Sequence, residues 1–230
     1  KVQSGLYRVT YTGKESTALV KHTPKQNKLT ELRHQLEKFH GVQHKNAVTT
    51  AWPHLGHADR FVCWAAMTAV QHQPLAQWKD RALNEKNFNK RVAALLGLCK
   101  VAVADPANSE AVPVDKQLAA AVYKSLGEVK WDKLNHTGKL TLVRTYQIAL
   151  VRFGKPNARA VEKIIAQLEP HFPATDFEQN WLLCETLVFL QAPGTAAKGI
   201  KLLQAADTQE EQIEYARSLR MLKTGWTTEL

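Results

Sequence analysis

The stretch Trp52-Pro-His-Leu-Gly-His-Ala-Asp59, followed by Arg60-Phe-Val-Cys-Trp-Ala-Ala66, decides the fold class. Small and apolar residues recur at helical spacing from Val62 to Ala69 and form one narrow stripe, on which neighbouring helices can approach closely. Asp59 directly precedes this stripe, and its carboxylate is suited to cap the free N–H groups at a helix start. The segment therefore predicts a turn followed by a capped, closely packed helix.

Helical periodicity continues on both sides of this stretch. The spacing of Leu29, Leu32 and Leu36 predicts the first helix, which Asn27 or Thr30 can cap. Thr208 with Glu211 forms a capping box near the other end of the chain. In all, eleven helices are predicted. Besides the first helix, ten are expected, at 45–55, from Asp59 to before Pro74, 74–85, 88–103, 115–126, 137–153, 157–168, 176–191, 195–205 and 208–222.

These helices predict an all-α protein. The chain has 230 residues, of which 44% are hydrophobic and 23% charged, so it can bury a core. It has no run of 18 apolar residues that would span a membrane. A globular bundle and a solenoid of helix pairs both fit, and the segment around Asp59 favours the solenoid. We expect an irregular α–α superhelix of the HEAT or armadillo type over residues 28–230.

The first residues have a different pattern. Residues 5–13, Gly-Leu-Tyr-Arg-Val-Thr-Tyr-Thr-Gly, alternate with period two and predict one strand. A lone strand is not stable, so residues 1–13 are interpreted as the terminal strand of a preceding domain. Residues 14–27 are polar, contain Pro24 and are expected to be a linker. The chain is thus expected to be a piece of a longer protein.

The positive charge is concentrated in one part of the chain. Residues 1–100 carry sixteen Lys and Arg against six Asp and Glu, a net +10 that equals the charge of the whole chain. Such a surface can attract phosphates or acidic partners. If it forms one concave face, a binding surface is expected at Lys25, Lys28, Arg33, Lys38, Lys79, Lys86, Lys90 and Arg91.

The patterns that signal chemistry are missing from the sequence. Cys63, Cys99 and Cys184 form no C-x-x-C pair and lie in apolar helical patterns, which indicates buried residues. His54 and His57 with Cys63 are a conceivable zinc site, but no H-E-x-x-H motif or carboxylate at ligand spacing accompanies them. The G-x-S-x-G motif, dinucleotide-binding glycines and P-loop are also missing. We therefore expect no catalytic residue, no metal and no cofactor.

Three segments carry a resemblance to a known arrangement. Residues 5–13 resemble the closing strand of a β-propeller of the sugar-dehydrogenase type. Residues 55–66 and 208–220 resemble the HEAT-like helical region of large bacterial multidomain proteins. In those proteins a membrane-bound-dehydrogenase-like propeller precedes the helices, and a c-type haem domain often follows. The resemblance implies a periplasmic or exported protein whose redox chemistry lies in neighbouring domains. Regular HEAT repeats usually carry Arg where this chain has Cys63, so no regular Asp–Arg ladder is expected.

The sequence thus favours a non-catalytic interaction, scaffold or spacer module whose partner is a protein or a neighbouring domain of the same chain. The alternative is a basic α-superhelix that binds nucleic acid, as some HEAT-like DNA repair enzymes do.

Overall fold

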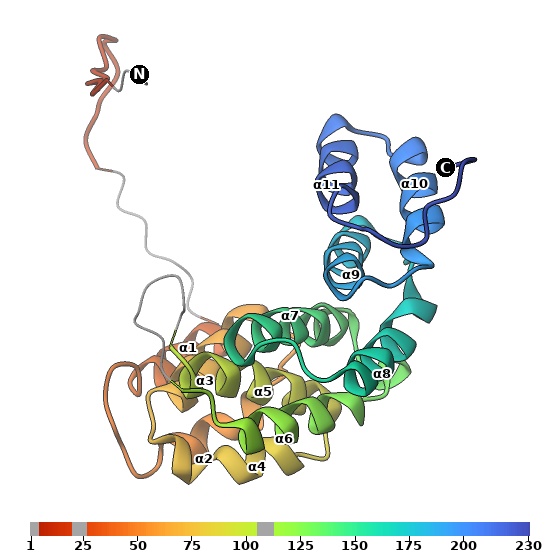
Figure 1. Cartoon of the computed structure of the whole chain (residues 1–230). Coiled ribbons are helices and arrows are strands. Elements are labelled where there is room, and N and C mark those ends of the chain that lie inside the picture. Colours follow the sequence, from red (N-terminus) through yellow and green to blue (C-terminus); the bar gives the residue numbers. More distant parts are fainter. Residues whose placement is uncertain (1–4, 20–26, 105–112) are drawn as a thin grey trace.

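The computed structural model describes residues 5–19, 27–104 and 113–230, and these residues contain eleven α-helices and no β-strand (Figure 1). The expected all-α class and the expected number of helices are therefore confirmed. None of the described helices is long and apolar enough to cross a membrane. The helices are α1 Lys28–Glu37, α2 Ala47–Ala51, α3 Arg60–Gln71, α4 Lys79–Asn84, α5 Phe88–Ala102, α6 Lys116–Gly127, α7 His136–Phe153, α8 Ala158–Leu168, α9 Phe177–Leu190, α10 Thr195–Ala205 and α11 Gln209–Leu219.

The helices pack in the order of the sequence. The odd-numbered helices α1 to α11 form one row, in which each packs on the next odd-numbered helix. Each even-numbered helix packs on the odd-numbered helix that follows it, and α4, α6 and α8 also contact one another in sequence. In Figure 1, α1 to α7 form the lower body, and α9 to α11 rise from one end of it. The most extensive interface is that between α5 and α7.

One continuous apolar core joins the odd-numbered row to the even-numbered helices, which we call the even-numbered row. Its largest fully buried side chains include Trp52, Trp78, Tyr146 and Phe172. Each such side chain stabilises the folded state by roughly 1.5–3 kcal/mol relative to an exposed one. The stripe on α3 contributes as predicted, because Val62, Ala66 and the other small residues of this face are buried.

Local capping explains where several helices begin. The Asp59 carboxylate accepts hydrogen bonds from the backbone N–H groups of Phe61 and Val62, so the predicted cap of α3 is confirmed. Asp115 caps α6 in the same way. The Thr208 hydroxyl accepts a hydrogen bond from the Glu211 backbone N–H, which is one half of the predicted capping box.

The strand predicted at residues 5–13 is wrong within this structure. These residues carry exposed side chains and form no strand, and Leu6, Tyr7 and Val9 are almost fully exposed. A strand exists only when a second backbone completes its hydrogen bonds, and no described residue supplies one. The sheet partners expected in a preceding domain remain a prediction. The linker expected at 14–27 falls partly outside the described residues.

The helix predicted at 74–85 is replaced by two shorter elements. A 3₁₀ turn covers Leu75–Gln77, and α4 begins only at Lys79. The backbone at Trp78 leaves helical geometry, with φ −137°, and its buried indole donates a hydrogen bond from Nε1 to the Gln73 carbonyl at 3.2 Å. Because this large ring is buried, the helix is interrupted at Trp78. The periodicity of apolar residues does not predict such an interruption.

Candidate functional site

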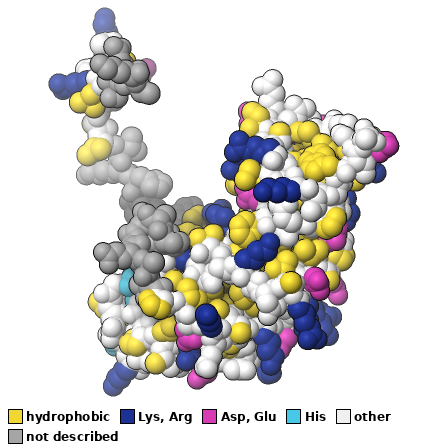
Figure 2. Space-filling view, viewed as in Figure 1, with side chains coloured by type: hydrophobic (Ala, Val, Ile, Leu, Met, Phe, Trp, Pro, Cys, Tyr) yellow, Lys and Arg dark blue, Asp and Glu magenta, His cyan; other side chains and the backbone are white. Residues whose placement is uncertain are grey.

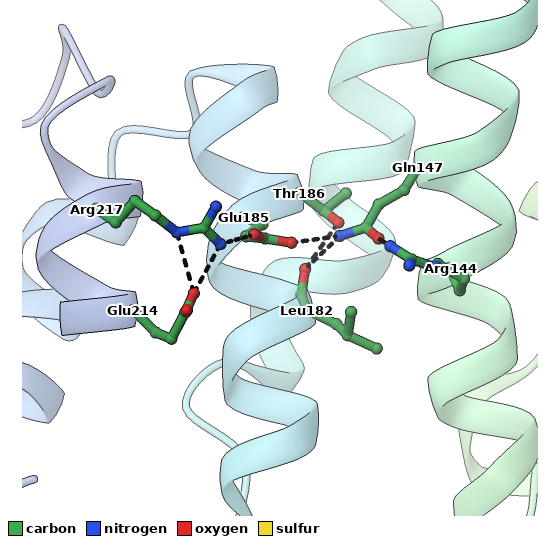
Figure 3. A network of polar contacts seen from close by, with 7 residues as sticks. All are labelled: Arg144, Gln147, Leu182, Glu185, Thr186, Glu214 and Arg217. Carbon is green, nitrogen blue, oxygen red and sulfur yellow. Dashed lines mark hydrogen bonds and ion pairs between the residues drawn. The ribbon is translucent and has the colours of Figure 1, made fainter. Parts of the chain in front are cut away.

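A chain of polar contacts crosses three successive odd-numbered helices (Figure 3). Arg144 on α7 donates to the Gln147 side-chain oxygen at 2.9 Å, and Gln147 Nε2 donates to Glu185 on α9 at 3.3 Å. The other Glu185 oxygen accepts from Arg217 on α11 at 2.5 Å, and Arg217 also contacts Glu214 at 2.7 Å. The hydrogen bond and the charge of Glu214, followed by those of Glu185, raise the pKa of the Arg217 guanidinium. The network connects α7, α9 and α11.

An apolar groove of about 260 Å³ lies beside this network, between α7 and α9. Its apolar walls include Leu150, Val151 and Phe189. Val151 is 56% exposed and Phe189 is 52% exposed, so both present apolar surface to solvent beside the groove. The Lys155 ammonium lies 6.0 Å from the centre of the Phe189 ring. We call this surface, comprising the network and the groove, the α7/α9/α11 face.

The charges on the α7/α9/α11 face are unevenly satisfied. Arg217 engages both Glu185 and Glu214, so these carboxylates are already paired. The Arg144 guanidinium donates a hydrogen bond to the neutral side-chain amide of Gln147. Figure 2 shows hydrophobic and basic side chains next to each other over the region where Figure 1 places α9 and α11. An apolar patch with an excess of cations suits an apolar protein segment that carries acidic residues.

Two more exposed aromatic residues lie beside cations on α3, and one of these cations, Lys100, belongs to α5. Phe61 is 60% exposed and Trp64 is 62% exposed. The Arg60 guanidinium lies 5.5 Å from the Phe61 ring centre, and the Lys100 ammonium lies 5.9 Å from that of Trp64. Exposed aromatic residues beside cations are enriched at protein interfaces. The same combination thus occurs on two parts of the odd-numbered row.

A larger groove lies on the even-numbered side of the molecule. It has a volume of about 570 Å³ and is lined by α6, α7 and α8. Its lining includes alanines, the almost fully buried Tyr123 and Tyr146, and Lys124 on α6 and Lys163 on α8. We call it the α6/α8 groove.

The predicted basic binding residues are spread over the structure. Lys28 and Arg33 lie on α1, and Lys38 follows it, whereas Lys79 begins α4 in the other row. Lys86 and Lys90 flank the start of α5, and Lys25 lies outside the described residues. Arg33 is paired with Glu37 at 3.2 Å. These residues are thus distributed over both rows.

Arg91 does not belong to a basic surface, which corrects that part of the prediction. Its side chain is buried, with the residue 4% exposed. It donates to the backbone carbonyls of Glu85 at 2.5 Å and Ser125 at 3.3 Å, and to the Glu128 carboxylate at 3.1 Å. Arg91 thereby joins the pair α4–α5 to the end of α6 and serves the fold.

The histidines and cysteines form no metal centre within the described part of the chain, where no group of three or more ligating side chains is found. The Gly56 backbone N–H donates to the Cys63 sulfur at 3.3 Å. The pKa of His54 is lowered, first by burial and then by the charges of His57 and Lys90. Burial also raises the pKa of Cys63. Both shifts favour the neutral side chains.

Sequence reasoning missed the α7/α9/α11 face. Phe189 lies in the apolar run Leu187-Val-Phe-Leu190, in which every position has a core-like composition. A helix that is apolar all round gives no indication of which residue stays exposed. The network joins residues that are far apart in the sequence, among them Arg144, Glu185 and Arg217. No local sequence pattern could therefore predict it.

No known protein family, curated protein or solved structure matches the chain.

Proposed function

We propose that this chain is a HEAT-like helical-repeat module that acts as an interaction or spacer element and performs no catalysis of its own. The α7/α9/α11 face carries the proposal, because it combines exposed apolar side chains with a polar network that connects three helices. Such pre-organisation lowers the entropy cost of binding a partner. The partner is a protein segment or a neighbouring domain of the same longer protein.

The packing of the helices supports the finer fold assignment. Helix pairs follow one another in the chain, and each packs chiefly on its neighbours. This is the contact pattern of an α-solenoid, whose repeated units bury one continuous core. We therefore propose an irregular α–α superhelix. The resemblance noted above supports placing it in an exported protein whose other domains carry the redox chemistry.

The binding test uses the whole chain and the segments that flank it in its parent protein, produced as separate domains. Wild-type chain is titrated with each domain by isothermal titration calorimetry, in parallel with Phe189→Glu and Arg144→Glu. Each variant places a charge against the proposed acidic, apolar partner, so at least a ten-fold loss of affinity is expected. The matched control is Arg159→Glu, an exposed residue on α8 outside this face. Equal binding by all four proteins would refute the surface assignment.

The absence of catalysis is tested separately. The chain is assayed for hydrolysis of ester, phosphoester and glycoside substrates and for electron transfer to a dye. Turnover that follows the folded protein through purification and is lost on unfolding would overturn the non-catalytic proposal.

The nucleic-acid alternative has a weaker basis in the structure. Its expected cations lie on both rows of helices, and Arg91 is buried. A basic superhelix would bind duplex DNA with an affinity that falls steeply with salt. Fluorescence anisotropy of labelled duplex DNA at low salt decides this, and salt-dependent micromolar binding would favour the alternative.

A further inference from the structure

The α6/α8 groove has the size and lining of a ligand site. Its volume of about 570 Å³ falls within the roughly 300–1,000 Å³ range of small-molecule pockets. On α6 its lining extends from Ala120 to Glu128, which is about two helical turns, or roughly 12 Å. Ala120, Gly127, Ala160 and Ala166 leave room between the helices because their side chains are small.

Tyr123 and Tyr146 beneath the α6/α8 groove are 9% and 0% exposed, so its accessible apolar surface comes mainly from Ala120, Ala160 and Ala166. The Tyr123 hydroxyl donates to the Gly154 carbonyl at 2.7 Å, and the Tyr146 hydroxyl donates to the Gln167 side-chain oxygen at 2.5 Å. Gln167 in turn donates to the carbonyls of Leu126 and Val129. These hydroxyl groups are therefore used internally, and an occupant meets mainly carbon atoms.

Two lysines and one glutamate line the rim of the groove. Lys124 on α6 and Lys163 on α8 line the groove, and neither ammonium has an ion-pair partner among the described residues. The acidic side chain at this rim is Glu128, and Arg91 engages it at 3.1 Å. The groove therefore presents an apolar floor with two available cations.

We infer that the α6/α8 groove binds a small anionic amphiphile, an unbranched acyl chain with a terminal carboxylate. The chain lies against Ala120, Ala160 and Ala166, and the carboxylate sits at Lys124 and Lys163. This inference is independent of the proposed docking at the α7/α9/α11 face.

The test titrates the whole chain with decanoate by isothermal titration calorimetry, below the concentration at which decanoate forms micelles. Saturable one-site binding with a Kd below about 1 mM is expected. Ala160→Trp fills the groove and should weaken binding at least ten-fold. Ala197→Trp, on an exposed part of α10, is the matched control and should bind as wild type. Circular dichroism spectra and thermal melts establish that both variants are folded.

A second arm tests the charges without altering the floor. Replacing Lys124 and Lys163 by Gln should weaken decanoate binding several-fold, whereas Lys201→Gln on α10 should leave it unchanged. Neutral decanol should bind wild type more weakly than decanoate does. The inference fails if wild type shows no saturable binding, or if Ala160→Trp binds decanoate as tightly as wild type. Equal affinity for decanol and decanoate would overturn the assignment of an anionic ligand. Tighter binding of a helical acidic peptide at this groove would replace the amphiphile with a protein partner.

Discussion

Replacing Arg91 by Ala should destabilise the protein by about 3 kcal/mol. The guanidinium makes three charge-assisted hydrogen bonds, to the carbonyls of Glu85 and Ser125 and to Glu128. Hydrogen bonds to charged groups contribute about 1.5–3 kcal/mol each, but water can reach some of the acceptors after the substitution. The Glu128 side chain is 53% exposed, so its ion pair alone is worth less than about 1 kcal/mol. Most of the loss therefore comes from the two carbonyls.

Urea unfolding followed by circular dichroism measures this. With a urea dependence of about 2 kcal/mol/M, a loss of 3 kcal/mol lowers the midpoint by about 1.5 M. Arg91→Lys keeps the charge but cannot reach all three acceptors, so it should lose about half as much. Glu128→Gln is the matched control and should cost less than about 1 kcal/mol. The reasoning is refuted if Arg91→Ala unfolds within about 0.3 M of wild type, or if Glu128→Gln costs as much as Arg91→Ala.

Three further predictions concern the backbone, the histidines and the cysteines. Gly56→Ala should lower the free energy of unfolding by about 2–4 kcal/mol, because φ is +73° and the added Cβ would lie 2.6 Å from the Asn89 carbonyl carbon. Gly41→Ala is the control, because φ is +74° there but the surrounding space is open, and it should lower the free energy of unfolding by only about 1 kcal/mol in the same urea titration. Burial first of all lowers the pKa of His54 and of His171, so both favour the neutral form in the folded state. Their contribution to stability is present above the pKa of histidine in the unfolded chain, about 6.5, and is lost as the pH falls below it. The urea midpoint of unfolding should therefore drop between pH 7 and pH 5. The drop should be smaller in a variant in which both histidines are replaced by Asn. Burial raises the pKa of Cys99 and of Cys184 to about 12, so a thiol reagent at pH 8 should label neither until denaturant is added; rapid labelling of either in the native protein would contradict this.

The helices could be predicted from the sequence because their signals are local. The caps at Asp59 and Asp115 and the apolar stripe from Val62 to Ala69 lie within one or two turns of the residues they order. Residues 5–13 carry an equally clear local pattern, yet they form no strand here. A strand depends on a second backbone, and periodicity says nothing of whether one is available.

The candidate sites could not be predicted, because they depend on contacts between distant segments. Arginine is usually exposed, so the sequence gives no sign that Arg91 is buried. Its burial is possible because the carbonyls of Glu85 and Ser125 accept hydrogen bonds from its guanidinium. The exposure of Phe189 likewise follows from how α7 and α9 pack. The sequence could not predict that the basic residues lie on both rows, because net charge does not say on which face of the fold each side chain lies.

The order of packing has a mechanical consequence. Each helix pair packs chiefly on the next one. A force that pulls α1 and α11 apart therefore acts on every interface between them, one after another. The softest interface then determines how far the molecule extends. Between α5 and α7 the contact is extensive and apolar, whereas α7 and α9 are separated partly by a groove and bridged by Gln147 and Glu185. Tension would therefore open the α5–α7 interface last, because it is the most extensive one in the row.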